Sequence, residues 1–195
     1  MFKFRLHLTS IFLSALLFTS SCHDEDNEAN GCMGGTFNFL TVGNHWESSF
    51  SGSLFSSDTL LMATVLEETE PGIFKLRTYS EPNNHLDATY YLQDCGDFLL
   101  RSATLPIRQE DKYMKGTRSV GDSWQYTDRA TNIVSNYQVL AKNVSITTPL
   151  GTFTCDRISY YQEGSFNTDT MYINNDYLFI KYDGIIQYEL ISKNF

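Results

Sequence analysis

The chain has 195 residues, a formal net charge of −9 and an aromatic content of 14%. A chain of this length can bury one full hydrophobic core. Nucleic acids and anionic lipid surfaces attract basic proteins, so the excess of acidic residues argues against nucleic-acid partners and against electrostatic docking on a membrane.

Residues 1–21 have the three parts of a secretory signal peptide. Two basic residues make the start positive, and residues 11–18 form an apolar run much shorter than the ~20 residues of a membrane-spanning helix. Small residues then precede Cys22 in an arrangement that resembles a lipobox, although Thr19 replaces the usual leucine. We expect cleavage before Cys22 and acylation of its thiol; the alternative is an ordinary signal peptide with a chance cysteine.

Residues 22–36 are expected to form a lipid-anchored acidic tether. Residues 23–31 are polar and acidic, which favours a solvated segment over a packed one. Their spacing lacks the glycine and the terminal glutamate of a calcium loop. The run is also similar to the acidic export signal of surface lipoproteins in the Bacteroidota. The predicted location is the cell envelope, with the chain lipid-anchored to the outer membrane and exposed at the cell surface.

From residue 37 onward the chain predicts many short antiparallel strands. Aromatic and β-branched residues alternate with polar ones, as in residues 74–79 and 170–173. Turn-forming groups such as residues 81–84 and 174–176 separate these runs. Beyond the signal, no run sustains apolar residues at helical spacing. The predicted fold class is therefore all-β and mainly antiparallel.

The chain contains a divergent internal repeat. The segment 42–46 (VGNHW) recurs as 120–124 (VGDSW), and these two segments hold both tryptophans of the chain. Further along, 69–74 (TEPGIF) matches 147–153 (TTPLGTF), with one residue added inside the turn. The landmarks of the repeat are Trp46, Trp124, Pro71, Pro149, Gly72, Gly151, Phe74 and Phe153.

The repeat predicts a single β domain, residues 37–195, made of two halves at 37–105 and 116–195 and joined by a charged linker at 106–118. In each half a Val-Gly turn precedes a strand with a buried Trp. A hairpin then turns at Pro-Gly and returns with a buried Phe. Neither half is expected to bury its apolar face alone, so the two halves should pack together as one sandwich or half-barrel.

Several short motifs resemble those of the TapB-type lipoproteins of Bacteroidota. Residues 146–155 (ITTPLGTFTC) are similar to the TPxGTFxC turn of that family, and residues 31–32 (GC) and 91–98 (YLQDCGDF) fit its pattern. The late strand of the family contains a glycine that is missing from residues 178–181 (LFIK). The family is largely uncharacterised, so the resemblance implies a class and an envelope location and no particular activity.

The cysteines other than Cys22 are three in number, so at least one must be free or paired between chains. Cys155 corresponds to Leu76 in the repeat, which predicts a small buried hydrophobe at this position. Cys32 and Cys95 have no apolar counterpart, and an exported compartment permits disulfides. The hypothesis is therefore a bond between Cys32 and Cys95, with Cys155 buried and free.

No catalytic, cofactor-binding or metal-binding residues are predicted. Residues 121–123 (GDS) resemble the nucleophile block of one hydrolase class, but the repeat places His45 at the position of Ser123, which favours a structural turn. Neither His45 nor His85 lies in a metal-ligand spacing. The carboxylates are expected mostly on solvated strand faces and loops. They include Glu67, Glu68, Glu70, Asp94, Asp97, Glu110, Asp111, Asp156 and Asp169.

Tyrosines clustered in the predicted strands are the most suggestive feature for function. Exposed rings can stack on sugars or anchor a protein partner; the alternative is that one ring of each adjacent pair lies in the core. We expect a non-catalytic binding or accessory domain for a glycan or a protein. The alternative is a carrier that holds a lipid or another apolar ligand in a concave face, and a hydrolase is less favoured. These tyrosines are Tyr90, Tyr91, Tyr160, Tyr161, Tyr172, Tyr177, Tyr182 and Tyr188.

The lipobox-like pattern generates the first prediction. The substitution Cys22→Ser removes the thiol that would be acylated, so the chain should no longer sediment with membranes after a carbonate wash, whereas the unsubstituted chain should. Immunoblotting of the pellet and the supernatant measures this. A Cys22→Ser chain that still pellets with washed membranes would show that the anchor lies elsewhere.

Overall fold

The computed structural model describes residues 32, 34–52, 55–82, 86–184 and 186–195, which form twelve strands and no helix. The predicted signal peptide and Cys22 lie outside these residues. Within the described part, no helix is long and apolar enough to cross a bilayer. The strands are β1 (His45–Gly52), β2 (Phe55–Glu70), β3 (Ile73–Glu81), β4 (Asp87–Asp94), β5 (Phe98–Ser102), β6 (Lys112–Lys115), β7 (Ser123–Asp128), β8 (Ile133–Thr148), β9 (Gly151–Gln162), β10 (Asp169–Asn174), β11 (Leu178–Asp183) and β12 (Ile186–Lys193).

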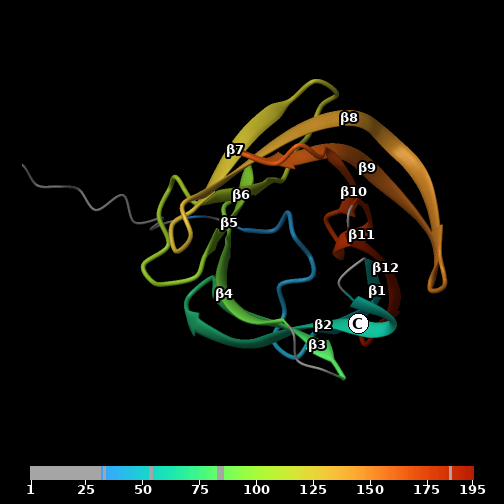
Figure 1. Cartoon of the computed structure of the whole chain (residues 1–195). Coiled ribbons are helices and arrows are strands. Elements are labelled where there is room, and N and C mark those ends of the chain that lie inside the picture. Colours follow the sequence, from blue (N-terminus) through green and yellow to red (C-terminus); the bar gives the residue numbers. More distant parts are fainter. Residues whose placement is uncertain (1–31, 33, 53–54, 83–85, 185) are drawn as a thin grey trace, which may run out of the picture.

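All twelve strands belong to one antiparallel sheet, which confirms the predicted fold class. Its order is β6-β5-β4-β3-β2-β1-β12-β11-β10-β9-β8-β7. Each half of the chain is thus a meander in which every strand pairs with the next, and the two meanders join where β1 pairs with β12. The sheet curls until its edge strands, β6 and β7, approach each other, and the result is a nearly closed barrel (Figure 1).

The turns before β1 and β7 have the same backbone conformation. Gly43 has a φ of 89° and Gly121 a φ of 91°, a region that side chains other than glycine rarely adopt. The amide of Gly43 donates to the carbonyl of Val65, and the amide of Gly121 donates to the carbonyl of Val139, both at 2.9 Å. The repeated Val-Gly segments therefore occupy matching places at the first strand of each half.

The aromatic landmarks of the repeat are buried to different degrees. Trp46 and Trp124 expose only 6% and 9% of their surfaces and belong to one core. Phe74 and Phe153 are only partly buried, so the prediction of a buried Phe was too strong. Each Phe lies close to a hairpin turn and packs against the main core from a partly exposed position.

The predicted linker at 106–118 contains strand β6, so the first half does not end at residue 105. Tyr113 and Met114 are both buried in the main core. Lys112 and Lys115 bracket this pair, and the charge of the surrounding residues obscured the strand in the sequence. The correction gives the halves equal numbers of strands and makes β6 the edge that meets β7.

The seam between β6 and β7 is closed by side chains, because these strands are the two ends of the sheet order and do not pair with each other. The indole Nε1 of Trp124 on β7 donates to the backbone carbonyl of Tyr113 on β6 at 3.1 Å. The rings of Tyr113 and Tyr126 also meet across the seam, edge to face, with centroids 5.3 Å apart. These side-chain contacts hold β6 and β7 together in place of the backbone hydrogen bonds that would close a complete barrel.

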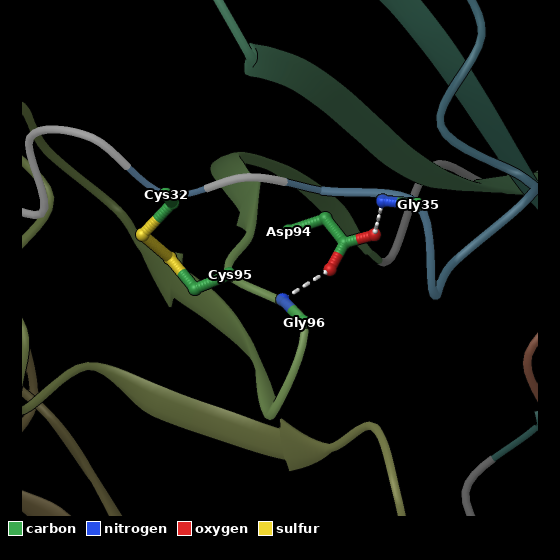
Figure 2. Close-up of a disulfide and its surroundings, with 5 residues drawn as sticks. All are labelled: Cys32, Gly35, Asp94, Cys95 and Gly96. Atoms are coloured by element: carbon green, nitrogen blue, oxygen red, sulfur yellow. Dashed lines mark hydrogen bonds between the residues drawn. A yellow bond between two sulfur atoms is a disulfide. The ribbon is translucent and has the colours of Figure 1, made fainter.

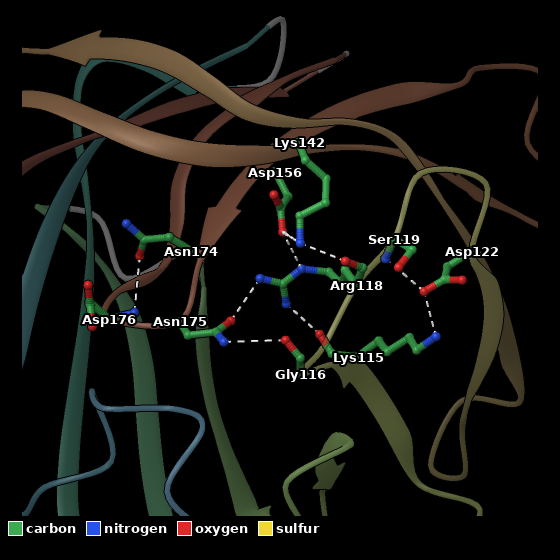
Figure 3. A network of polar contacts seen from close by, with 10 residues as sticks. All are labelled: Lys115, Gly116, Arg118, Ser119, Asp122, Lys142, Asp156, Asn174, Asn175 and Asp176. Carbon is green, nitrogen blue, oxygen red and sulfur yellow. Dashed lines mark hydrogen bonds and ion pairs between the residues drawn. The ribbon is translucent and has the colours of Figure 1, made fainter.

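A buried arginine fixes the connection between the edge strands (Figure 3). Arg118 donates from Nε to the carboxylate of Asp156 on β9 at 2.8 Å, and from Nη2 to Asn175 Oδ1 at 2.7 Å. Its Nη1 donates to the carbonyl of Lys115. Lys142 in turn donates to the carbonyl of Arg118 at 2.6 Å. This network satisfies the buried charges and ties the seam to β8, β9 and the β10–β11 turn.

Asp94, at the end of β4, holds the segment that precedes β1 (Figure 2). One carboxylate oxygen accepts the amides of Gly35, Thr36 and Phe37 at 2.8–2.9 Å, and the other accepts the amide of Gly96 at 2.8 Å. The end of the predicted tether is therefore bound to the barrel. The solvated run predicted from the sequence covers residues 23–31, and the bound residues come after it, where an ionised carboxylate offers strong acceptors to consecutive backbone amides.

A disulfide joins Cys32 to Cys95 beside this carboxylate, and Cys155 is free and buried, which is the arrangement expected from the sequence (Figure 2). The bond closes a loop with a sequence separation of 63 residues. Beyond it, Phe37 and Phe39 are buried in the main core and close one end of the barrel.

The seam generates the second prediction. Trp124→Phe removes the hydrogen bond to the Tyr113 carbonyl and leaves a buried acceptor unpaired, which should lower the free energy of unfolding by about 1–3 kcal/mol beyond the loss of ring size. Trp46→Phe is the matched control, because it trims the equivalent ring without opening the seam. Urea denaturation monitored by circular dichroism measures both. Equal losses in the two variants would contradict the role given to Trp124.

Candidate functional site

A cavity of about 420 Å³ lies inside the barrel, mainly against the strands of the first half. This volume is within the range of about 300–1,000 Å³ that is typical of sites for small molecules. The apolar residues of its wall are Trp46, Leu61, Ala63, Leu76, Leu86, Ala88, Leu92, Leu178 and Phe179.

A second interior cavity, of about 320 Å³, lies against β7 to β10 and has a more polar wall. Its polar groups include Asp128, Thr131, Ser135 and Gln162, together with several tyrosine hydroxyls. The two cavities are adjacent because they share part of their walls. The shared residues are Tyr90, Arg101, Tyr113, Phe179 and Tyr188.

The alternation of the strands decides which tyrosines face this interior. On β9, Tyr160 lines the polar cavity, while its neighbour Tyr161 is 44% exposed on the outside. On β4, Tyr90 lines both cavities, while Tyr91 packs on the opposite face against the small cluster that contains Leu100. In both adjacent pairs, only one ring points into the barrel, which agrees with the alternative interpretation of the paired tyrosines.

The inward rings form an interior aromatic cluster that spans both halves. Centroids lie 5.3 Å apart between Tyr137 and Tyr160 and 5.2 Å apart between Tyr182 and Tyr188. Burial raises the pKa of Tyr113 to about 12, so its hydroxyl is neutral at physiological pH. Burial also raises the pKa values of Tyr137 and Tyr188 well above the ordinary value. The cluster therefore lines the cavity with apolar ring faces and neutral hydroxyls.

Arg101 on β5 brings a positive charge into this aromatic surface. Its guanidinium carbon lies 3.8 Å from the ring centroid of Tyr113, 4.6 Å from that of Tyr90 and 4.8 Å from that of Tyr126. Such contacts with ring faces stabilise a cation, more so where water is excluded. Arg101 lies between the apolar and the polar cavity, because it belongs to both walls.

The two ends of the barrel differ. The N-terminal segment closes one end, where Phe37 hydrogen-bonds to Asp94 and the amide of Asn38 donates to the carbonyl of Asn175 at 2.9 Å. Strand β4 runs from Asp87 to Asp94, so Asp87 lies at the opposite end. Asp87 and the partly exposed Leu86 both line the apolar cavity, which places its mouth at that opposite end.

The outer face of β7, β8 and β9 carries a groove of about 530 Å³. Gln125 Nε2 donates to Asn136 Oδ1 at 2.7 Å, while the side-chain nitrogen of Asn136 is buried and has no hydrogen-bond partner. The exposed ring of Tyr161 lies in the same groove. The groove thus combines amide groups with one exposed aromatic ring.

The described residues that the sequence analysis considered for catalysis or metal binding do not lie together in one site. Ser123 is exposed and lines the outer groove, and His45 lies 3.6 Å from the carboxylate of Glu47. His85 lies outside the described residues. Within the described part of the chain, no three His, Cys, Asp or Glu side chains gather where they could hold a metal ion.

Three of the carboxylates are exceptions to the prediction that most of them lie on solvated faces and loops. Asp94, Asp111 and Asp156 are buried, because each has strong donors around it. The sequence analysis did not single out Arg101. The signal for it was a lone arginine in the apolar run of β5, two residues after the buried Leu99 and therefore on the same face of the strand.

Two solved structures share features of this fold. A predicted lipoprotein from Parabacteroides distasonis ATCC 8503 is 14% identical, with a TM-score of 0.48, and the match covers 83% of this chain and 100% of that chain. A predicted exported protein with a YmcC-like fold from Bacteroides fragilis NCTC 9343 is 11% identical, with a TM-score of 0.51, and the match covers 82% of this chain and 99% of that chain. No family model and no curated protein matches the sequence. The second structure shows a similar fold, and the resemblance to TapB-type lipoproteins stays a prediction.

Proposed function

We propose that this chain is a non-catalytic, lipid-anchored protein of the cell envelope whose barrel binds a small apolar molecule. The observation that carries the proposal is the apolar cavity of about 420 Å³ inside the barrel. The signal peptide and Cys22 support an anchor in the outer membrane at the cell surface. The fold shared with an exported protein is compatible with that location.

The position of the aromatic residues favours the carrier over a flat binding platform. Both tryptophans are buried in the core and cannot stack on an external ligand. Most of the inward tyrosines form the cluster around the cavities instead. An apolar ligand in this interior would be removed from water on most sides, and each Å² of apolar surface buried contributes roughly 25 cal/mol.

The cavity generates the third prediction. Ala88 lines its wall near the mouth, so the substitution Ala88→Phe places a ring in the space that a ligand would occupy. We expect the uncharged fluorescent probe N-phenyl-1-naphthylamine to bind the full chain, carried as the Cys22→Ser form, with an affinity that Ala88→Phe weakens at least tenfold. Fluorescence titration measures this.

Ala130→Phe is the matched control, since Ala130 is exposed in the turn between β7 and β8 and lines neither interior cavity. It should bind the probe as the parent chain does. Equal affinity in the Ala88→Phe variant would show that the probe binds elsewhere and would contradict the proposed site.

The outer groove supports a second candidate function, the binding of a glycan. The groove is lined by the amide side chains of Gln125 and Gln138 and by the hydroxyls of Ser123 and Ser159, which can donate to and accept from the hydroxyls of a sugar. The exposed ring of Tyr161 offers a surface for the apolar face of a sugar. A glycan that binds here would contact Tyr161 and Gln125 together.

A glycan array of the Cys22→Ser chain tests this candidate and is the fourth prediction. Tyr161→Ala should abolish the signal of any glycan that the parent chain retains, because the stacking surface is lost. Phe166→Ala removes a more exposed ring that does not line the groove and should leave the signal unchanged. An array without any retained glycan, or a signal that survives Tyr161→Ala, would exclude the groove as the site.

A further inference from the structure

We propose that the ligand of the barrel is a single-chain amphiphile with a carboxylate head group, and that Arg101 binds this head group while the apolar cavity holds the tail. The inference rests on the proposed function, because it assigns the chemistry of a ligand to the same interior.

The guanidinium of Arg101 has unused donors. Its Nε lies 3.4 Å from the hydroxyl of Tyr126, a long contact, and this is the side chain's only hydrogen bond to the described residues. Nη1 and Nη2 therefore donate to no residue that the structure describes. A guanidinium presents a planar fork that matches both oxygens of a carboxylate. Because the rings of Tyr90, Tyr113 and Tyr126 cover its faces, the edge of the fork is the part left for a ligand.

The charge of Arg101 has no carboxylate partner among the described residues. Asp87 lines the apolar cavity but binds Arg77 through both of its oxygens, at 3.0 and 2.8 Å. Asp128 lines the polar cavity, and its Oδ1 accepts the backbone amides of the following turn. An anion that enters the barrel would therefore meet one unpaired cation.

The surrounding hydroxyls do not supply the missing negative charge. Burial raises the pKa values of Tyr113 and Tyr126, so both phenols stay protonated at physiological pH. Arg101 is partly buried, so its unpaired charge loses part of its hydration, and a carboxylate placed against the guanidinium offsets that cost. Neutral phenols beside it can donate further hydrogen bonds to the same carboxylate.

The interior consists of an apolar and a polar cavity, and this difference fixes the orientation in which an amphiphile would bind. Arg101 belongs to both cavities, one walled by Leu76, Leu92 and Leu178 and the other by polar groups of the second half. A head group at Arg101 would face the polar side, and a tail on the apolar side would contact leucine and aromatic surfaces. A neutral alcohol of the same length would fill the same apolar space but could not pair with the charge.

The fifth prediction compares dodecanoate with dodecanol, each used below its aggregation limit to displace N-phenyl-1-naphthylamine from the Cys22→Ser chain. Dodecanoate should bind at least tenfold more tightly than dodecanol, because hydrogen bonds to a charged group are stronger than neutral ones. Arg101→Gln should reduce this ratio to near one while dodecanol binding changes little. Arg157→Gln removes the same charge from an exposed position on β9 and should keep the ratio.

A ratio near one in the parent chain, or a ratio that survives Arg101→Gln, would overturn the head-group assignment and leave the apolar site standing. Failure of both ligands to displace the probe would instead count against the proposed function. If Arg101→Gln does not fold, dodecanoate labelled with carbon-13 at its carboxyl group gives the answer in the parent chain by NMR. A carboxyl paired with Arg101 should titrate at lower pH than free dodecanoate, and titration at higher pH would overturn the assignment.

Discussion

The contact between the edge strands β6 and β7 is the constraint on which the rest of the structure depends. A sheet of twelve strands that ended in two free edges would be open to water along its inner face and to other chains along its edges. The indole of Trp124 bonds to the β6 backbone, and Arg118 anchors the connecting turn to β9. These side chains bring the edges together without a ladder, and the curled sheet then encloses an interior.

Because the sheet curls into a barrel, one end can be closed by the N-terminal segment and the interior can be lined by tyrosines. The N-terminal segment, held by Asp94 and by the disulfide between Cys32 and Cys95, fills one end with Phe37 and Phe39. Core side chains fill only part of the remaining interior, and the rest is open space. It is lined by tyrosines from both halves, whose rings provide apolar surface and whose hydroxyls remain neutral. This combination is the basis of the proposal that the barrel binds an apolar ligand.

Much of the fold could be predicted from the sequence, because strand alternation and turn residues are local signals. The Val-Gly turns and the two tryptophans led directly to matching positions in β1 and β7. Strand β6 was missed because its two apolar residues lie between lysines in a charged segment. The burial of Asp94 was missed because its partners are backbone amides that lie far from it in the sequence.

The candidate site was less predictable, since the cavity depends on how the sheet curls. The sequence marked the tyrosines as a group and left open whether they faced a ligand or the core. The significance of Arg101 appears only when β4, β6 and β7 bring Tyr90, Tyr113 and Tyr126 around it. No short motif encodes that arrangement, because its members come from four different strands and Tyr126 on β7 joins the others only across the seam.

The most direct test of the central claim is a crystal structure with 12-bromododecanoate, in which anomalous scattering locates the bromine. A ligand held by Arg101 at its head group should give a bromine peak inside the apolar cavity toward its mouth, near Leu61, Leu86 and Ala88, with its carboxylate density at the guanidinium. A peak on the outer surface, or a carboxylate directed away from Arg101 inside the barrel, would contradict the account.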